Sequence, residues 1–382
     1  MRNLMFKMSA FPLIIIILAC SIQYSASTVF YQKIKPVYTD TYTPEYKPYY
    51  TPDSDAYIDT SKALIGEAEL TPIVKYRLFA PLIPALALIF KDFIGYTSAY
   101  LFLNFLFLIL ASIYFYRFCC KLFIVNDSAL CSTIMFITAM PVVTWGPCVL
   151  VEMGSWAVSA IVLFYTYSSG LRNGRQIILF SVLFAISVLT KPTLAFLVLF
   201  SCAYLFFVRK EYYTAIFAGL ASSVMVLLVY YGMGLTLKDF TSFGYPRHQH
   251  TMLVVSSCVF AYHLLLPLFY FGVKGVRNSK TGVSEDSYRR IVTCLWIYLL
   301  CTFLGYLMFV HAVRLVFTTY LALIPLAVIG IEYIQNRYKL KNFLIKSTVA
   351  YVVASNVLTA TYLSQILIPL GKQLVGMTAW DP

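Results

Sequence analysis

Three carboxylates lie close together near the start of the chain, in the stretch DSDAYIDTSKALIG (residues 53–66). Asp53, Asp55 and Asp59 fall within seven residues of a chain that is only 12% charged and 60% hydrophobic. A carboxylate that is held in place can take a proton from a reacting hydroxyl. The stretch is therefore a candidate catalytic segment. The alternative is a solvated polar helix that keeps this part of the chain out of a membrane.

Basic side chains recur in short polar turns elsewhere in the chain. Arg77 opens the run RLFAPLIPALALIF, Lys191 lies in LTKP, Arg247 lies in YPRHQH and Arg314 lies in HAVR. Arg binds phosphate through a two-pronged fork and Lys binds it as a point charge. Carboxylates combined with such cations suit a substrate that carries a phosphate and a hydroxyl to be deprotonated. Each cation has the simpler alternative of anchoring a helix end at the lipid head groups.

The composition indicates that membrane-spanning helices must position these residues. Mean hydropathy is +0.78, and a spanning helix needs about 20 mostly apolar residues. The chain contains many such runs. We predict an all-α polytopic membrane protein with about eleven spans, at residues 8–26, 98–116, 128–143, 148–168, 176–190, 193–208, 213–234, 253–272, 291–310, 315–333 and 344–368.

The basic clusters predict which loops face the cytoplasm. The net charge of +13 would suggest a nucleic acid partner in a soluble protein, but Lys and Arg also gather in the cytoplasmic loops of membrane proteins. With the N-terminus inside, the clusters at 117–121, 172–175, 209–210, 274–290 and 336–346 all fall on that side. A span at residues 77–90 would turn every later cluster outward. We therefore expect this run to lie on the outer interface, and we expect no nucleic acid partner.

Residues 27–97 then form one long exported loop with interfacial helices. This loop belongs to a single transmembrane domain of residues 1–382, with no separate soluble domain. Asp53 or Ser54 can cap a helix that Gly66 ends, which places Asp55 in the first turn, where the helix dipole favours negative charge. The first 28 residues resemble a secretion signal, but an uncleaved first span fits a polytopic protein better.

The same topology places loops that are far apart in the sequence on one outer face. Besides the acidic segment and the four cations, this face carries other polar residues: Glu152, Asp239, His248, His250 and His311. Positive charge on an exported face is unusual, because Lys and Arg normally gather in the cytoplasmic loops. Ionisable groups near membrane depth are costly, and they therefore indicate function. A lipid-linked phosphosugar in the outer leaflet has the matching chemistry. The two histidines of HQH, without a third ligand in view, do not predict a metal site.

Four short motifs resemble the integral-membrane glycosyltransferases of the GT-C type, which include the protein O-mannosyltransferases and the aminoarabinose transferases of lipid A. The motifs are Asp-x-Asp-x-Tyr at residues 53–57, YRLFAPLIPAL before a span that ends in YRFCCKLF, the LTKP turn, and HAVRLVFTTYLALIPLAV. The resemblance covers the whole span pattern. The chain departs from the family in the first loop, which shows no clear second acidic pair. We also expect it to lack the large exported domain that follows the last span in some members.

The resemblance implies a transferase that moves a hexosyl or pentosyl group from a polyprenyl-phosphate donor to an acceptor hydroxyl on the exported face. Asp55 and Asp53 would be the catalytic carboxylates, with Asp55 as general base. The donor phosphate would be bound by four cations: Lys191, Arg247, Arg314 and Arg77. Supporting roles fall to Glu152, His248, His311 and Tyr57. A base on one side and phosphate-binding groups on the other favour in-line displacement with inversion.

The resemblance also implies the partners of the protein. These are the lipid-linked donor, an acceptor that is a glycan, a lipid or a protein, and the membrane lipids. Some members of the family use a divalent cation, and Asp53 and Asp55 could bind Mg²⁺ or Mn²⁺ through oxygen, so metal use stays open. A bacterial inner membrane with the site facing outward is favoured over the endoplasmic reticulum.

Two other functions compete with this interpretation. A polyprenyl-linked glycan polymerase would be expected to use a large late exported loop rich in Arg, whereas the longest late loop, near residues 235–252, is modest. A lipid-linked sugar flippase or transporter would be expected to show an internal repeat and charges at the bilayer midplane, and the sequence shows neither clearly. The transferase is therefore favoured.

Overall fold

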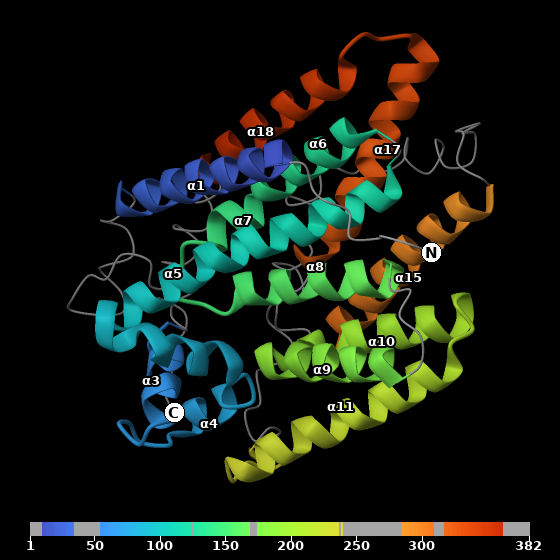
Figure 1. Ribbon diagram of the computed structural model, residues 1–382. Helices are drawn as coiled ribbons and strands as arrows, with labels where there is room; N and C mark the ends of the chain where they lie inside the picture. The colour runs from blue at the N-terminus through green and yellow to red at the C-terminus, as the bar shows by residue number, and fades with distance from the viewer. Residues whose placement is uncertain are drawn as a thin grey trace.

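The computed structural model describes residues 10–33, 54–123, 125–168, 174–236, 238–239, 285–308 and 317–361. The regular structure in these ranges is helical (Figure 1). The helices are α1 (Ala10–Lys33), α3 (Ser54–Ala63), α4 (Pro72–Arg77), α5 (Leu82–Leu122), α6 (Asn126–Ile137), α7 (Met140–Trp145), α8 (Glu152–Ser168), α9 (Gly174–Thr190), α10 (Ala195–Ala203), α11 (Tyr212–Gly232), α15 (Glu285–Met308), α17 (Tyr320–Tyr338) and α18 (Phe343–Thr361). Three short helices, η2 (Pro192–Leu194), η3 (Tyr204–Val208) and η4 (Phe317–Thr319), complete the set.

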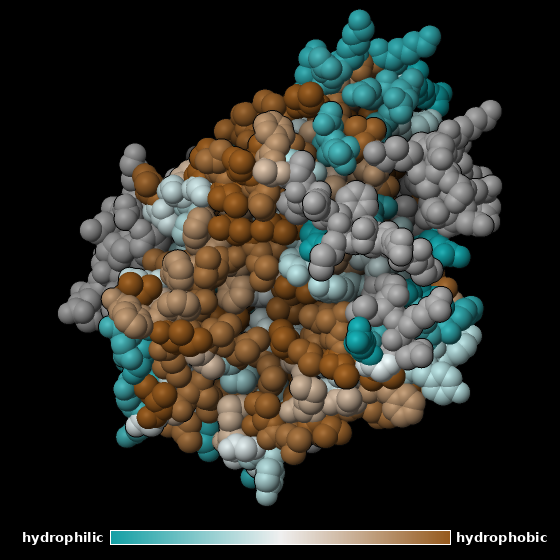
Figure 2. Space-filling model, viewed as in Figure 1, coloured by the Kyte–Doolittle hydropathy of each residue, from teal (hydrophilic) through white to brown (hydrophobic). Residues whose placement is uncertain are grey.

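Several helices have the character of membrane spans. Within the described ranges, residues 10–29 of α1, the whole of α5 and the whole of α11 are long and apolar enough to cross a membrane. One side of α11 exposes large side chains every three or four residues: Tyr213, Phe217, Leu220, Val224, Leu228 and Tyr231. Figure 2 shows a face covered mostly by hydrophobic residues, with hydrophilic residues toward its margins. Such a surface suits lipid and supports an integral membrane protein, whereas the number of spans stays a prediction.

Helix α5 contains two segments that were predicted to be separate. Residues 82–90 of the predicted interfacial run at 77–90 and the predicted span at 98–116 both lie in this helix of 41 residues. The helix is broken at Gly95, where φ is 76° and ψ is 163°, a conformation that glycine adopts without steric cost. Residues 82–94 therefore turn away from the long part of the helix (Figure 1). Arg77 lies before this run, at the end of the separate short helix α4.

Three other predicted spans are interrupted or shortened. The segment 128–143 consists of α6 and α7, with a break at Thr138 and Ala139, because Pro141 cannot continue α6. The segment 148–168 becomes helical only at Glu152. The predicted span at 193–208 is η2, α10 and η3 in succession. The remaining predicted spans correspond to helices α1, α9, α11, α15, α17 and α18, except 253–272, which lies outside the described residues.

The centre of the bundle is the contact between α5 and α8, which is the most extensive contact between described helices. Gly154 makes close approach possible near the start of α8. A Cβ at this position would lie 2.7 Å from Ile83 Cδ1 and 3.5 Å from Phe107 Cε2. Small residues at such contacts are typical of membrane helix pairs. Because Ile83 and Phe107 lie on opposite sides of the Gly95 break, the start of α8 packs against both parts of α5.

This packing predicts opposite effects of one substitution at two glycines. Gly154→Ala should destabilise the fold by about 1–3 kcal/mol, because the buried Ile83 side chain must move. Gly219→Ala should be neutral or stabilising, by up to about 1 kcal/mol, since the nearest atom to its new Cβ, Cys202 Sγ, is 3.8 Å away. Thermal unfolding in detergent measures both, and an equal rise in Tm for the two variants would contradict the packing described here.

Candidate functional site

Local sequence signals define the helix that carries Asp55. Helix α3 begins at Ser54 and has Asp55 in its first turn, as predicted. It ends in a Schellman motif, in which Gly66 N donates to Ala63 O at 3.2 Å and Glu67 N donates to Lys62 O at 2.9 Å. Gly66 has a φ of 78°, a backbone angle that residues with a Cβ atom rarely adopt. The prediction that Gly66 ends this helix is confirmed.

Helix α3 turns one face toward the protein and the other outward. Ser54, Tyr57 and Ser61 lie on the buried face, whereas Asp55 is partly buried and Asp59 forms an exposed ion pair with Lys62 at 3.6 Å. The buried face is bonded to α5, since Ser61 Oγ donates to Pro84 O at 3.0 Å and Tyr100 Oη donates to Tyr57 O at 2.8 Å. These bonds fix the orientation of the outer face that carries Asp55.

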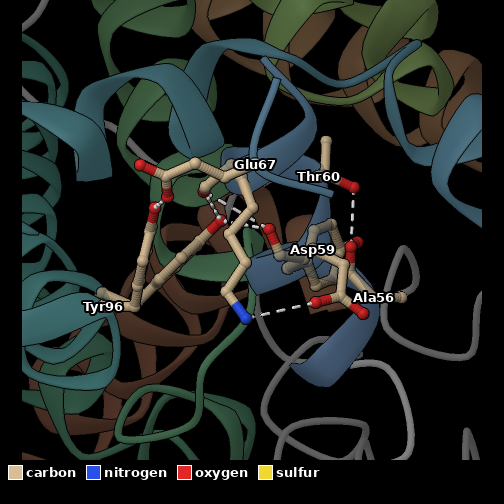
Figure 3. A network of polar contacts seen from close by, with 9 residues as sticks. Ala56, Asp59, Thr60, Glu67 and Tyr96 are labelled. Atoms are coloured by element: carbon tan, nitrogen blue, oxygen red, sulfur yellow. Dashed lines mark hydrogen bonds and ion pairs between the residues drawn. The ribbon is translucent and has the colours of Figure 1, made fainter. Parts of the chain in front are cut away.

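A second set of contacts holds the end of α3 at the break in α5. Glu67 follows the Schellman turn and accepts from Lys91 Nζ at 3.1 Å and from Tyr96 Oη at 2.8 Å. The two donors flank Gly95. Figure 3 shows Glu67 and Tyr96 turned toward each other beside α3. The hydrogen bonds from Tyr96 and Lys91 lower the pKa of Glu67. The carboxylate therefore stays ionised, and both hydrogen bonds persist, at neutral pH.

The start of α3 contacts the segment that leads into α8. Ser54 Oγ donates to Val149 O at 3.0 Å. Glu152, the first residue of α8, follows three positions later, which is no more than about 11 Å of backbone. The acidic segment and Glu152 are thus brought to the same end of the bundle, although 97 positions separate Asp55 from Glu152 in the sequence.

Glu152 and Lys191 form a largely buried ion pair at this end. Lys191 Nζ donates to Glu152 Oε1 at 2.9 Å, with exposed side-chain fractions of 15% and 2%. The first turn of α8 suits the negative charge of Glu152. Lys191 precedes Pro192 and has an extended backbone, with φ of −164° and ψ of 121°, because proline disfavours helix at the residue before it. The Lys-Pro step ends α9 and fixes the position of the lysine.

Arg77 contacts Tyr57 of helix α3. Its Nη1 donates to Tyr57 Oη at 3.1 Å, and its Cζ lies 4.8 Å from the centre of the Tyr57 ring. Tyr57 is two positions beyond Asp55, which is about 200° around a helix. The described contacts of Arg77 and Tyr57 therefore lie on the face of α3 opposite to Asp55. A role for Arg77 at the donor phosphate stays a prediction.

Helix α11 also contacts the segment between α4 and α5. Tyr230 Oη donates to Phe79 O at 2.8 Å, and the two rings pack edge to face. Just beyond the helix, Asp239 lies 4.0 Å from Lys75 of α4. The end of α11, from which the chain continues toward Arg247, is thus at the same end of the bundle as α3. Nothing in the sequence pattern pointed to Tyr230, which lies in an apolar run.

The basic groups at the other end of α8 form a separate cluster. Arg209 Nη1 donates to Thr166 O at 3.4 Å and its Nη2 donates to Glu211 at 2.6 Å, while Arg117 lies over the ring of Phe164. From Glu152 to Thr166 a helix extends about 21 Å. The two polar regions therefore occupy opposite ends of the bundle, as the charge pattern in the sequence requires.

Several predicted site residues lie outside the described residues: Asp53, Arg247, His248, Arg314 and His311. Their roles stay predictions. Within the described ranges, no group of three or more His, Cys, Asp or Glu side chains gathers as metal ligands would. The described part of the acidic stretch at 53–59 contributes Asp55 and Asp59, and Asp59 forms an ion pair with Lys62. The described residues do not fit a metal ion on their own, and no step proposed below depends on one.

The fold is similar to that of an archaeal membrane enzyme. The archaeal oligosaccharyltransferase AglB from Archaeoglobus fulgidus, in complex with an inhibitory peptide and a dolichol-phosphate, aligns with a TM-score of 0.50 and 12% identity over 92% of this chain and 55% of that one. The apo form of the oligosaccharyltransferase from the same organism gives a TM-score of 0.49 and 11% identity over 91% of this chain and 55% of that one.

These similarities concern the fold alone, because the sequence identity is so low. The chain spans 55% of the length of the solved structures that it resembles. The AglB match shows a similar fold and does not test which transferase family the chain resembles. No protein-family model and no curated protein sequence matches the chain significantly.

The ion pair between Glu152 and Lys191 makes a prediction about stability. Lys191→Met should destabilise the fold by about 3–5 kcal/mol, because it leaves a buried carboxylate without this partner. The double variant Glu152→Leu/Lys191→Met should recover most of that loss, since an apolar pair often replaces a buried ion pair without cost. Thermal unfolding in detergent tests this. A double variant that is less stable than both single variants would show that the pair does not act as a unit.

Proposed function

We propose that the protein is a glycosyltransferase that moves a sugar from a polyprenyl-phosphate donor to an acceptor hydroxyl on the exported face of a membrane. The observation that carries the proposal is that the acidic helix α3 bonds the segment leading into Glu152, so that α3 and the Glu152–Lys191 pair lie at one end of an apolar helical bundle. The similarity to AglB, whose structure contains a dolichol-phosphate, supports a lipid-phosphate donor.

In the proposed reaction, Asp55 is the general base. Its carboxylate takes the proton of the acceptor hydroxyl while the hydroxyl oxygen attacks the anomeric carbon of the donor. The bond from that carbon to the phosphate oxygen breaks as the new glycosidic bond forms, which inverts the anomeric centre. A base in this position typically contributes a factor of about 10²–10⁴.

Lys191 would stabilise the charge that develops on the leaving phosphate. A cation held in a water-poor site stabilises such charge more strongly than one in water. Glu152 holds Lys191 in place before the donor binds, through the bond at 2.9 Å. An ammonium carries three N–H donors, so one lysine can bond a carboxylate and a phosphate at the same time. Arg247 and Arg314 are proposed to bind the same phosphate from the later outer loops.

The direct test is transfer by protein in lipid nanodiscs, with radiolabelled polyprenyl-phosphate sugars and a panel of acceptors. Asp55→Asn should lower kcat by about 10²–10⁴-fold. Asp59→Asn is the matched control, because it removes a carboxylate of the same helix that lies in an exposed ion pair, and it should keep near wild-type activity. Equal activity of Asp55→Asn and wild type would remove Asp55 from the mechanism, and movement of the donor across the bilayer without transfer would favour a flippase.

The double variant at the ion pair separates a structural role from a role in donor binding. Glu152→Leu/Lys191→Met should be folded and yet fail to transfer sugar, with donor binding weakened by at least about tenfold, since a charge-assisted contact to the phosphate is lost. Binding of the labelled donor to the purified variant measures this. Normal donor binding and normal turnover would assign the pair to the fold alone.

A further inference from the structure

The connection between α7 and α8 is irregular in backbone and yet fully buried. Cys148, Val149, Leu150 and Val151 all have an exposed fraction of 0%, although residues 146–151 belong to no helix. A buried segment without regular structure must find partners for its backbone groups elsewhere. In this segment, two successive backbone carbonyls accept hydrogen bonds from side chains of two different helices.

The two donors are Asn104 of α5 and Ser54 of α3. Asn104 Nδ2 donates to Cys148 O at 2.6 Å, and Ser54 Oγ donates to Val149 O at 3.0 Å. Both side chains are themselves buried, with exposed fractions of 1% and 0%. Their bonds therefore form away from bulk water, where losing a partner is costly. The segment 146–151 is held between α3 and α5 at adjacent residues.

This arrangement links the two halves of the proposed site. Ser54 directly precedes Asp55, and Val149 lies three residues before Glu152, which holds Lys191. We infer that Ser54 and Asn104 are positioning residues, which set the spacing between the base on α3 and the phosphate-binding lysine through the segment 146–151. The inference rests on the proposed function for its catalytic consequence, while the link itself is a property of the fold.

The spacing matters because the sugar must fit between the two groups. The base meets the acceptor hydroxyl on one side of the anomeric carbon and the lysine meets the phosphate on the other. In-line displacement needs both at once, and a misplacement of about 1 Å can cost about 10²-fold in rate. Loss of the Ser54 bond leaves Lys191 and Glu152 intact, so it should affect turnover and spare the binding of the donor phosphate.

The test compares Ser54→Ala with Ser61→Ala. Both serines lie on the buried face of α3 with an exposed fraction of 0%, but Ser61 bonds α5 through Pro84 O and not the segment 146–151. Ser54→Ala should lower kcat by about 10–100-fold with an unchanged KM for the polyprenyl-phosphate sugar, whereas Ser61→Ala, which leaves α3 bonded to the segment 146–151, should lower kcat much less. Ser54→Thr retains a hydroxyl and should restore turnover. Asn104→Ala should reproduce the effect of Ser54→Ala from the other side of the segment.

Amide hydrogen exchange tests the link without any assay of activity. Ser54→Ala should speed exchange in residues 54–63 and also in 146–156, whereas Ser61→Ala should speed it in 54–63 alone. Equal loss of kcat in the two variants, or unchanged exchange of 146–156 in Ser54→Ala, would overturn the inference. If wild-type protein transfers no sugar, the proposed function fails, while hydrogen exchange still decides whether Ser54 holds the segment.

Discussion

A carboxylate that is removed from water must be paired, and this constraint organises the molecule. Glu152 is 2% exposed and bonds Lys191 at 2.9 Å, so the start of α8 and the end of α9 have to meet. Breaking such a pair costs far more than forming it gains, which makes their meeting obligatory. Since α8 is about 25 Å long, the cluster around Arg209 and Glu211 is held at the opposite end. The Glu152–Lys191 pair and the Arg209–Glu211 pair therefore lie about one length of α8 apart, at opposite ends of the bundle.

Helix α3, which carries Asp55, is fixed by contacts with other parts of the protein. Helix α3 is short and contributes little stability alone. It is held at its start by Ser54, along its length by Tyr57 and Ser61, and beyond its end by Glu67. These contacts come from the segment 146–151 and from both sides of the Gly95 break. A carboxylate on such a helix is preorganised, which is what a general base requires.

Local signals in the sequence predicted local structure well. The helix from Ser54 to the Gly66 turn and the turn at Lys191 and Pro192 follow from capping and proline rules that involve only neighbouring residues. The break at Gly95 falls between the predicted interfacial run at 77–90 and the predicted span at 98–116, where Lys91 and Asp92 interrupt the apolar sequence. Hydropathy could not reveal the buried irregular segment 146–151, because it is as apolar as a span. The partnership of Glu152 with Lys191 was also missed, since it joins residues 39 positions apart and depends on how the helices pack.

The claim that the Glu152–Lys191 end of the bundle is the reactive end can be tested most directly with bound donor. A cryo-electron microscopy structure of the protein in nanodiscs with a polyprenyl phosphate would locate the phosphate. The account predicts a phosphate oxygen about 2.8 Å from Lys191 Nζ, with the start of α3 across the site from it. A phosphate bound at the opposite end of α8, beside Arg209, with Lys191 contacting only protein, would contradict it.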